Sequence, residues 1–287
     1  MINRKNIMTA CLSSLLGMQI ALADEYPKQA EDWLKAAQNP LIPVFSLPLE
    51  YTHHGGAENG DVSIGRIKPI IPVSIGNWNM INQLSLNFIG TPGPVTGIEE
   101  LPQPYPGNGS NGLGDTNFTS LFSPETSGDF RWGFGPTFVF PTDTRFGNTE
   151  DRTSRQLGSG KFSIGPAMMV VSQPGPWTLG FKSRQIWSVL GNDSRESVSQ
   201  LILEPFANYN IGQGWYVTTD MNTIANWNSH SDNRWTLPVG AGVGKLFNLD
   251  TFAINTKLEG YYNVVRPDAA PEWSANFTVQ FMLPKLF

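Results

Sequence analysis

The chain has 287 residues and a formal net charge of −5, from 19 basic and 24 acidic side chains. Only 15% of its residues are charged, against the roughly 25% usual in soluble domains. This acidic composition excludes a typical nucleic-acid-binding protein, which would carry a basic surface. The chain also holds 29 glycines and 22 prolines, a composition that favours many strands and turns over helices.

Residues 1–23 have the pattern of a secretory signal peptide. Arg4 and Lys5 precede an apolar run that ends in Ala-Leu-Ala, a small-x-small cleavage site. A transmembrane anchor is the alternative, but the run is short for a span of about 20 residues. Cleavage after Ala23 would remove Cys11, the only cysteine, and would leave 17 basic and 24 acidic side chains, a net charge of −7.

Residues 24–41 predict a short amphipathic helix. Ala30, Trp33, Leu34 and Ala37 are spaced at i, i+3, i+4 and i+7, which places them on one helical face. A helix of about three turns is about 18 Å long and cannot span a membrane. It could lie on a membrane surface or in solvent, or it could fold into a larger domain with Trp33 and Leu34 against the wall.

From residue 42 to residue 287 the chain alternates apolar and polar residues in segments typical of half-buried strands. We predict twelve strands. Their ranges are 43–52, 62–75, 78–88, 114–122, 130–140, 162–171, 177–189, 198–209, 215–227, 235–247, 251–263 and 273–286.

The connections between these strands alternate in length. Short ones follow the even-numbered strands, such as residues 76–77, and longer polar ones follow most odd-numbered strands, such as residues 89–113. An antiparallel up-and-down transmembrane β-barrel has this pattern, with short periplasmic turns and longer external loops. We therefore predict an all-β fold of this kind, and an even strand count would place both ends on the periplasmic side.

The side chains agree with a membrane barrel. On residues 215–227 one face is apolar with an indole at each end, Trp215 and Trp227, and the opposite face is polar. Strands of about 9–11 residues with aromatic ends fit a lipid-facing band between aromatic girdles. Because every backbone amide in hydrocarbon must be paired, such a sheet must close on itself.

The last strand is amphipathic, and the chain stops directly after it on Phe287, in phase with its apolar face. Bacterial outer-membrane barrels typically end in this way, and the barrel assembly machinery recognises the terminal aromatic residue. We therefore expect a monomer in the outer membrane after export, with outer-membrane lipid and this machinery as partners.

Five segments of the C-terminal half carry a resemblance to known proteins. They are LGSGKFSIGPAMMVV (157–171), QPGPWTLGF (173–181), LEPFANYNIGQGWYVTT (203–219), RWTLPVGAGVGKLF (234–247) and YYNVVRPDAAPEW (261–273). These segments resemble one family of Gram-negative outer-membrane barrels, which is called "neuromedin U"-like or transporter and is related to phenol-degradation (MetA-pathway) barrel proteins. The resemblance implies an outer-membrane barrel and supplies no catalytic residues.

The phase of the strands places six basic and five acidic residues on the face that would line the lumen. Such a balanced interior predicts either ion pairs that stiffen the barrel or a polar permeation path, with no clear preference for one sign of charge. These residues are Glu50, Arg66, Lys68, Asp115, Arg131, Lys182, Arg184, Glu204, Asp220, Lys257 and Glu259.

Candidates for catalysis or metal binding are weak. His53 and His54 adjoin in the first long connection and His230 lies in the fifth, without the spacing of a metal site. Ser63 and Asp61 lie close in sequence to the two histidines, but no recognisable hydrolase spacing joins them. We therefore predict no metal, no cofactor and no enzymatic activity.

The sequence favours a channel or transporter-like barrel that passes or gates small molecules. The alternatives are an outer-membrane hydrolase acting on lipid or peptide at the external rim, and a structural or adhesive surface barrel. In a channel, the helix of residues 24–41 would be a plug in the barrel mouth. Trp33 and Leu34 would then rest against a face of small residues, Gly240, Gly242 and Gly244.

Overall fold

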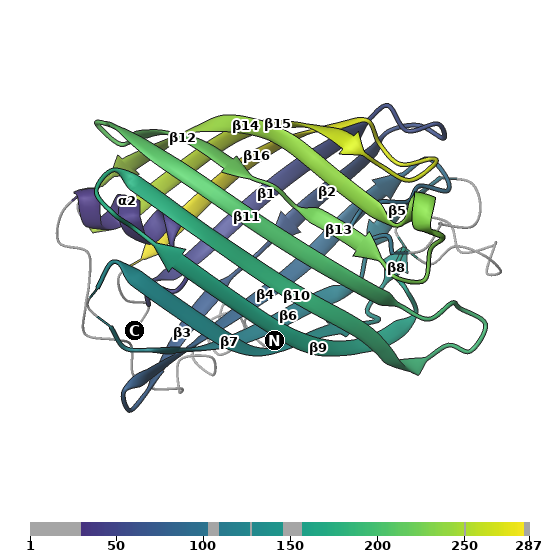
Figure 1. Cartoon of the computed structure of the whole chain (residues 1–287), viewed down its shortest axis with the longest axis horizontal. Coiled ribbons are helices and arrows are strands. Elements are labelled where there is room, and N and C mark those ends of the chain that lie inside the picture. Colours follow the sequence, from purple (N-terminus) through teal and green to yellow (C-terminus); the bar gives the residue numbers. More distant parts are fainter. Residues whose placement is uncertain (1–29, 103–108, 127, 146–156, 250, 284–287) are drawn as a thin grey trace, which may run out of the picture.

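The computed structural model describes residues 30–102, 109–126, 128–145, 157–249 and 251–283. The signal peptide predicted over residues 1–23 and the terminal Phe287 lie outside these ranges. The chain folds into one closed antiparallel barrel, with the α-helix at one end (Figure 1).

Twelve strands form the wall, as predicted, and two of them are each interrupted and carry two labels. They are β1 (Phe45–Gly55), β2 (Val62–Ile67) with β3 (Ile70–Ile75), β4 (Trp78–Thr91), β6 (Thr116–Pro124), β7 (Phe130–Phe140), β9 (Lys161–Ser172), β10 (Trp177–Gly191), β11 (Ser199–Gly212), β12 (Trp215–Asp220) with β13 (Thr223–Asn226), β14 (Trp235–Asn248), β15 (Ala253–Val265) and β16 (Trp273–Leu283).

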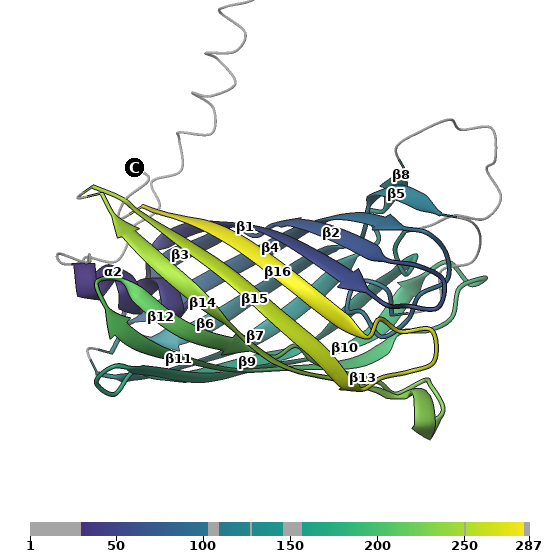
Figure 2. The same ribbon diagram turned by 90° about the horizontal axis from the view of Figure 1, so that it is seen from above.

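The barrel closes between its first and last strands. β1 pairs with β16 along its whole length, from Phe45 opposite Leu283 to Gly55 opposite Trp273. Two short strands, β5 (Ser110–Leu113) and β8 (Thr144–Arg145), pair with each other and extend the sheet beyond β4. Figure 2 shows the strands tilted across the barrel, as closure of a barrel requires. Because β1 pairs with β16, the twelve-stranded wall has no free edge.

The interruption between β12 and β13 is bridged by side-chain hydroxyls. Residues 219–223 do not pair with β14, where Pro238 lacks an N–H group. The Tyr261 hydroxyl accepts a hydrogen bond from the Asp220 N–H at 2.7 Å, and the Thr219 hydroxyl donates to the Gly240 carbonyl at 2.9 Å. The side chains thus replace part of the missing ladder, since unpaired backbone is costly in a membrane.

The two ends of the barrel differ in their connections. At the short-turn end, residues 76–77, 173–176 and 213–214 join neighbouring strands. At the long-loop end the connections include residues 56–61, 192–198 and 227–234, the last with a 3-10 turn at Ser231–Asn233. Helix α2 (Ala30–Gln38) lies at the short-turn end, and β5 and β8 lie at the other (Figure 1).

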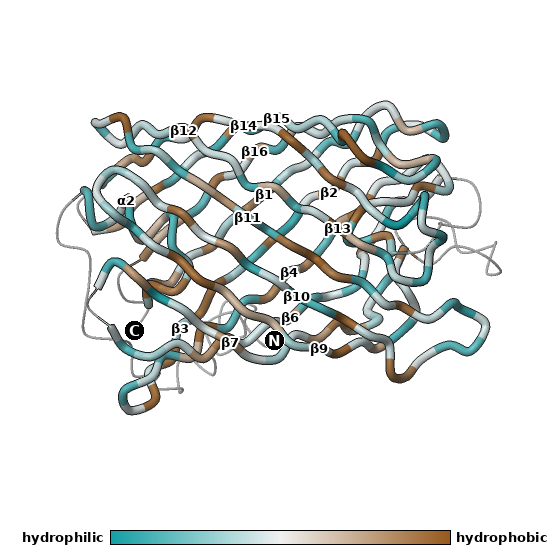
Figure 3. The backbone as a smooth tube through the Cα atoms, in the orientation of Figure 1, coloured by the Kyte–Doolittle hydropathy of each residue, from teal (hydrophilic) through white to brown (hydrophobic). Residues whose placement is uncertain are grey.

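The outer surface is an apolar band with aromatic rings near both ends. Trp177 packs on Tyr209 at the short-turn end, and Trp227 packs on Trp235 at the long-loop end, with ring centroids 4.7 Å and 5.9 Å apart. Hydropathy alternates along the strands in Figure 3, as expected when one face meets lipid and the other faces inward. Among the described residues, no helix combines the length and the apolar character needed to cross a bilayer.

Candidate functional site

A polar cavity of about 320 Å³ occupies the interior of the barrel. Ala37, Gln38 and Pro40 line it from the short-turn end, and residues 97–100 line it from the long-loop end. Between these two segments the wall contributes mainly charged, amide and hydroxyl side chains from inward-facing strand positions. The cavity is therefore a hydrophilic chamber bounded at each end by a segment that is not part of the barrel wall.

Five basic and six acidic side chains line this chamber. Nine of them were predicted from the strand phase, and Glu99 and Glu100 were not. The basic residues are Arg66, Lys68, Lys182, Arg184 and Lys257, and the acidic residues are Glu50, Glu99, Glu100, Glu204, Asp220 and Glu259.

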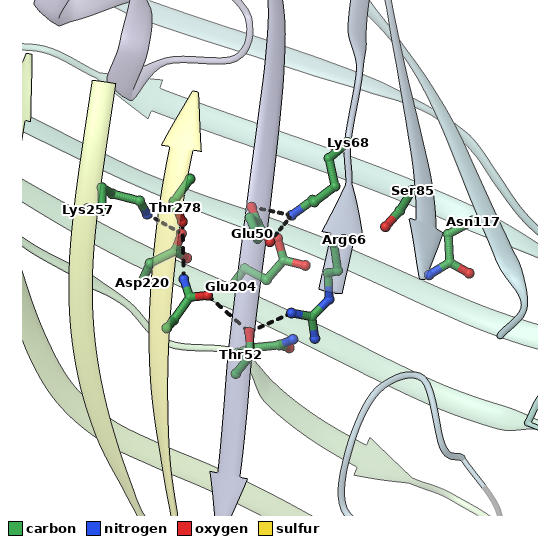
Figure 4. Close-up of polar contacts among 12 residues, drawn as sticks. Glu50, Thr52, Arg66, Lys68, Ser85, Asn117, Glu204, Asp220, Lys257 and Thr278 are labelled. Atoms are coloured by element: carbon green, nitrogen blue, oxygen red, sulfur yellow. Dashed lines mark hydrogen bonds and ion pairs between the residues drawn. The ribbon is translucent and has the colours of Figure 1, made fainter. Parts of the chain in front are cut away.

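The wall charges pair with one another, either across strands or within one strand. Lys68 Nζ lies 3.1 Å from Glu50 Oε1, and Lys182 Nζ lies 3.0 Å from Glu204 Oε2. Lys257 lies 3.1 Å from Glu259 and 3.7 Å from Asp220. Of these groups, Figure 4 labels Glu50, Lys68, Glu204, Asp220 and Lys257, which point into one space. Pairing of this kind reduces the cost of keeping charges away from bulk water.

Residues 92–102, which follow β4, fold into the barrel and form an inward loop. Its apolar side chains are buried: Val95, Ile98 and Leu101 pack in one cluster with Ile64 and Ile89 of the wall. The same cluster also contains Val62 and Leu157. The base of the loop is therefore anchored by apolar packing against β2 and β4.

The acidic tip of the inward loop binds the two arginines of the chamber. Arg66 Nε donates to Glu100 Oε1 at 2.5 Å, and Arg184 Nη2 donates to Glu99 Oε1 at 2.7 Å. Asn222 Nδ2 donates to the other oxygen of Glu99 at 3.0 Å. Because these partners lie on β2, on β10 and between β12 and β13, the loop is tied across the lumen.

The two carboxylates are held in a nearly dry setting. The side chains of Glu100 and Glu99 are only 4% and 10% exposed. Burial opposes ionisation of Glu100, but the Arg66 guanidinium outweighs it and keeps the pKa of that carboxyl below its ordinary value. Sequence reasoning missed both residues, although two adjacent acids between Ile98 and Leu101 in a long loop were a usable signal.

Helix α2 covers the opposite mouth of the chamber. Trp33 is 2% exposed and Leu34 is 7% exposed, and both belong to a buried cluster with Tyr216, Leu246 and Met282. These partners belong to β12, β14 and β16. The apolar face predicted from the helical spacing is therefore the face that packs inside the barrel.

Polar contacts fix the other side of the helix. Gln38 Nε2 donates to Asn210 Oδ1 at 2.8 Å and Asn39 Nδ2 donates to Gln173 Oε1 at 2.9 Å. Leu41, two residues further, is fully buried against Leu121 and its neighbours in the facing wall. The segment from Trp33 to Leu41 consequently crosses the mouth from one side to the other.

The three glycines of β14 do not receive the helix as predicted. A side chain at Gly244 would meet the ring of Tyr216, and side chains at Gly242 and Gly240 would meet Glu259 and Tyr261. Large residues on the adjacent strands therefore occupy this space. Trp33 packs in the buried cluster that contains Tyr216, and the ring of Tyr216 also covers Gly244.

Two of the predicted lumen charges lie outside the chamber lining among the described residues. Asp115 precedes β6 at the long-loop end, where its carboxylate accepts hydrogen bonds from the N–H and hydroxyl of Ser159, both at 2.7 Å. Burial raises the pKa of Asp115 to about 6. Arg131 lies at the short-turn end of β7, where the mouth is filled by Leu41 and its apolar neighbours.

The three histidines occupy separate environments. His54 lines the chamber, His53 is on the outward face of β1 beside Trp273, and His230 is exposed in the connection between β13 and β14. Across the ranges that the structure describes, no three His, Cys, Asp or Glu side chains are grouped as metal ligands.

Several buried polar atoms around the chamber have no protein partner among the described residues. They include Glu100 Oε2, Arg184 Nε, Asn222 Oδ1 and His54 Nε2. Unsatisfied buried groups are rare in native proteins, and water or a bound solute commonly completes them. The chamber thus presents both hydrogen-bond donors and hydrogen-bond acceptors to a polar solute.

Comparison with solved structures identifies outer-membrane channels with the same fold. An outer membrane channel from Pseudomonas putida F1 superposes with a TM-score of 0.57 at 13% identity, covering 84% of this chain and 94% of that one. The NanC porin superposes with a TM-score of 0.51 at 11% identity, covering 84% and 100%. No family model and no curated protein matches the chain. At these identities the likeness establishes a fold shared with outer-membrane channels.

Proposed function

We propose that this protein is an outer-membrane channel for small hydrophilic solutes, closed at rest by the inward loop at one end and by helix α2 at the other. The observation that carries the proposal is the charged chamber between these two segments. A barrel needed only for mechanical stability could fill its interior with apolar side chains, whereas this one keeps eleven charges around a cavity.

The orientation follows from the connections. In outer-membrane barrels the short turns face the periplasm and the long loops face outward. The inward loop would then guard the external mouth and α2 the periplasmic mouth. Export by the segment of residues 1–23, assembly through Phe287 and a monomeric state belong to the same proposal.

The chemistry of the chamber favours a hydrophilic solute. The sequence resembles barrels associated with phenol degradation, and an aromatic hydrocarbon would be one expectation from that resemblance. Charged groups that line the path, such as Arg184 and Glu204, instead suit a solute that exchanges hydrogen bonds with water. The unpartnered donor and acceptor atoms support a neutral or charged polar molecule over a hydrocarbon.

The proposal is tested by swelling of liposomes that contain the purified mature protein. We expect slow swelling in small sugars for the wild-type protein and faster swelling when the inward loop, residues 92–102, is replaced by a short glycine-serine linker. Leu258→Val on the outward face of β15 is the matched control and should leave swelling unchanged. A heat-modifiable, folded barrel that stays sealed after loss of both the loop and α2 would overturn the proposal.

A further inference from the structure

The outward face of β1 and β2 carries a second cluster of polar side chains that the pore does not use. His53 on β1 lies directly opposite Ser63 on β2 in the strand register. Asp61 immediately precedes β2, and its carboxylate accepts a hydrogen bond from the Gly56 N–H at 3.1 Å. The adjacent inward residues, Thr52 and His54, line the chamber, so His53 and Ser63 face away from it.

The imidazole of His53 joins the serine to the carboxylate. His53 Nδ1 lies 3.3 Å from Ser63 Oγ, and His53 Nε2 lies 3.3 Å from Asp61 Oδ2. Because a carboxylate only accepts hydrogen bonds, Asp61 selects the tautomer with its proton on Nε2. Nδ1 then presents its lone pair to the serine hydroxyl, as a general base requires.

Tyr51 completes the cluster from the same face of β1. Its hydroxyl lies 3.0 Å from Ser63 Oγ. Since the serine hydroxyl donates to His53 in this tautomer, the tyrosine hydroxyl donates to Ser63. A donor next to a nucleophile can also stabilise the oxyanion that forms when the nucleophile attacks a carbonyl, and tyrosine serves this purpose in some enzymes.

The position of the cluster indicates its substrate. The His53 ring packs on Trp273 at 5.4 Å, and Trp273 is 41% exposed on the outer surface at the long-loop end of β16. Tryptophans of an aromatic girdle sit at the boundary between lipid headgroups and acyl chains. Ester carbonyls of membrane lipids lie at this same depth.

We propose that Ser63, His53, Asp61 and Tyr51 form a serine esterase site for the acyl esters of membrane lipids. Ser63 Oγ attacks the ester carbonyl carbon and its proton passes to His53 Nδ1, while Asp61 stabilises the imidazolium and Tyr51 donates to the oxyanion. The ester C–O bond breaks, and the leaving alcohol takes the proton from His53. Water then attacks the acyl-serine with His53 as base, which releases a carboxylic acid and restores Ser63.

The test uses the full mature protein in mixed micelles with a long-chain p-nitrophenyl ester and a fluorophosphonate probe. We expect the probe to label Ser63, identified by peptide mass spectrometry, and Ser63→Ala to lose both labelling and turnover. His53→Gln should lower turnover by about 10³-fold or more. Tyr51→Phe should lower kcat more than it raises KM, because the oxyanion exists only in the transition state.

The matched control is Ser197→Ala, since Ser197 is an exposed serine at the same end of the barrel and should leave labelling and turnover unchanged. Heat-modifiability shows that each variant folds. A folded wild-type protein that is not labelled at Ser63 and hydrolyses no faster than Ser63→Ala would overturn the esterase. Because these residues lie on the outer surface, Ser63→Ala should swell liposomes like the wild type, so failure of the esterase and failure of the channel are distinguishable.

Discussion

The two segments that bound the chamber are held by different physical interactions. At the short-turn end α2 buries Trp33 and Leu34 in an apolar cluster with Tyr216. At the long-loop end the tip of the inward loop is held by the ion pairs of Glu99 with Arg184 and of Glu100 with Arg66. The position of α2 therefore depends mainly on removal of apolar surface from water, whereas the tip of the inward loop depends on buried ion pairs beyond its apolar base.

This difference indicates which closure moves. Apolar burial contributes roughly 25 cal/mol per Å² and is insensitive to moderate salt. A buried ion pair contributes little net free energy, because the cost of desolvating both charges offsets most of their attraction. A solute or ion that supplies new partners can thus replace the loop contacts at small cost. We infer that the inward loop is the movable gate and that α2 is the fixed plug.

The largest expected effect comes from removing the plug. Deletion of residues 25–39 should raise the rate of liposome swelling several-fold, because the strands close without α2 and the mouth loses Trp33. The increase should be the same in low and high salt, since the lost contacts are mainly apolar. Glu31→Ala, on the exposed side of the helix, is the control. A deletion variant that is heat-modifiable, and so folded, but stays sealed would refute the plug role.

Trp33→Ala should also raise the rate of liposome swelling, but by less than the deletion does. Truncation of a buried tryptophan costs about 3–5 kcal/mol, and here the loss falls on the docking of α2. Limited proteolysis after Lys35 should therefore be faster in the variant than in wild type, with the barrel still heat-modifiable. Equal proteolysis rates would show that Trp33 does not hold the helix in place.

At the long-loop end, substitution of Glu99 and substitution of Glu100 should increase opening of the inward loop to different extents. Glu100→Gln removes the carboxylate that pairs with Arg66 and leaves the hydrogen bond of Arg66 to the Thr52 hydroxyl, whereas Glu99→Gln leaves Arg184 paired with the Glu204 carboxylate at 2.8 Å. Loop opening should therefore increase more in Glu100→Gln, by roughly tenfold, as expected for loss of a charged hydrogen bond. The rate of maleimide reaction at a cysteine introduced by Ile98→Cys reports opening, because Ile98 is buried at rest.

The effect of salt, with and without the two carboxylates, tests further whether the ion pairs control loop opening. Added salt should speed the reaction of Ile98→Cys in the wild-type background and have less effect in the double variant Glu99→Gln with Glu100→Gln. Identical rates in all backgrounds would mean that the apolar base of the loop alone sets its position, and that the ion pairs do not control the gate.

The smallest expected effect concerns Asp115, beside the loop end but outside the chamber lining. Burial raises the pKa of Asp115 to about 6, above its ordinary value of 3.8, so the folded state binds the extra proton. The stabilisation of the folded state by this proton is complete below about pH 4 and is lost as the pH rises through 6. Amide exchange at Ser159, corrected for its intrinsic rate, should therefore be less protected at pH 7 than at pH 4.5, and Asp115→Asn should remove this dependence.

The barrel was predictable from the sequence because its signals are local. Alternation with period 2 fixes which side chains of a strand face lipid, and turn length fixes which strands are neighbours. Trp33 and Leu34 were also predictable, since the spacing of an amphipathic helix is set within one segment. The structure places both of them in the barrel mouth.

The contacts of the inward loop were not predictable in the same way. Glu99 binds Arg184, 85 residues away, and that contact exists only because the closed barrel brings β10 within reach of the loop. The glycines of β14 suggested space for a helix, but side chains on neighbouring strands lie closer, so Tyr261 covers Gly240 instead. Likewise, His53 and Ser63 meet only through the register of β1 and β2.

Single-channel recording in planar bilayers tests the central claim most directly. For the wild-type protein we predict brief, small openings that become more frequent when salt is raised. Glu99→Gln with Glu100→Gln should lengthen the openings at low salt, and deletion of residues 25–39 should raise the unit conductance itself. Long-lived openings of one size in all three proteins, with the same salt dependence, would contradict a channel closed by a charged gate and an apolar plug.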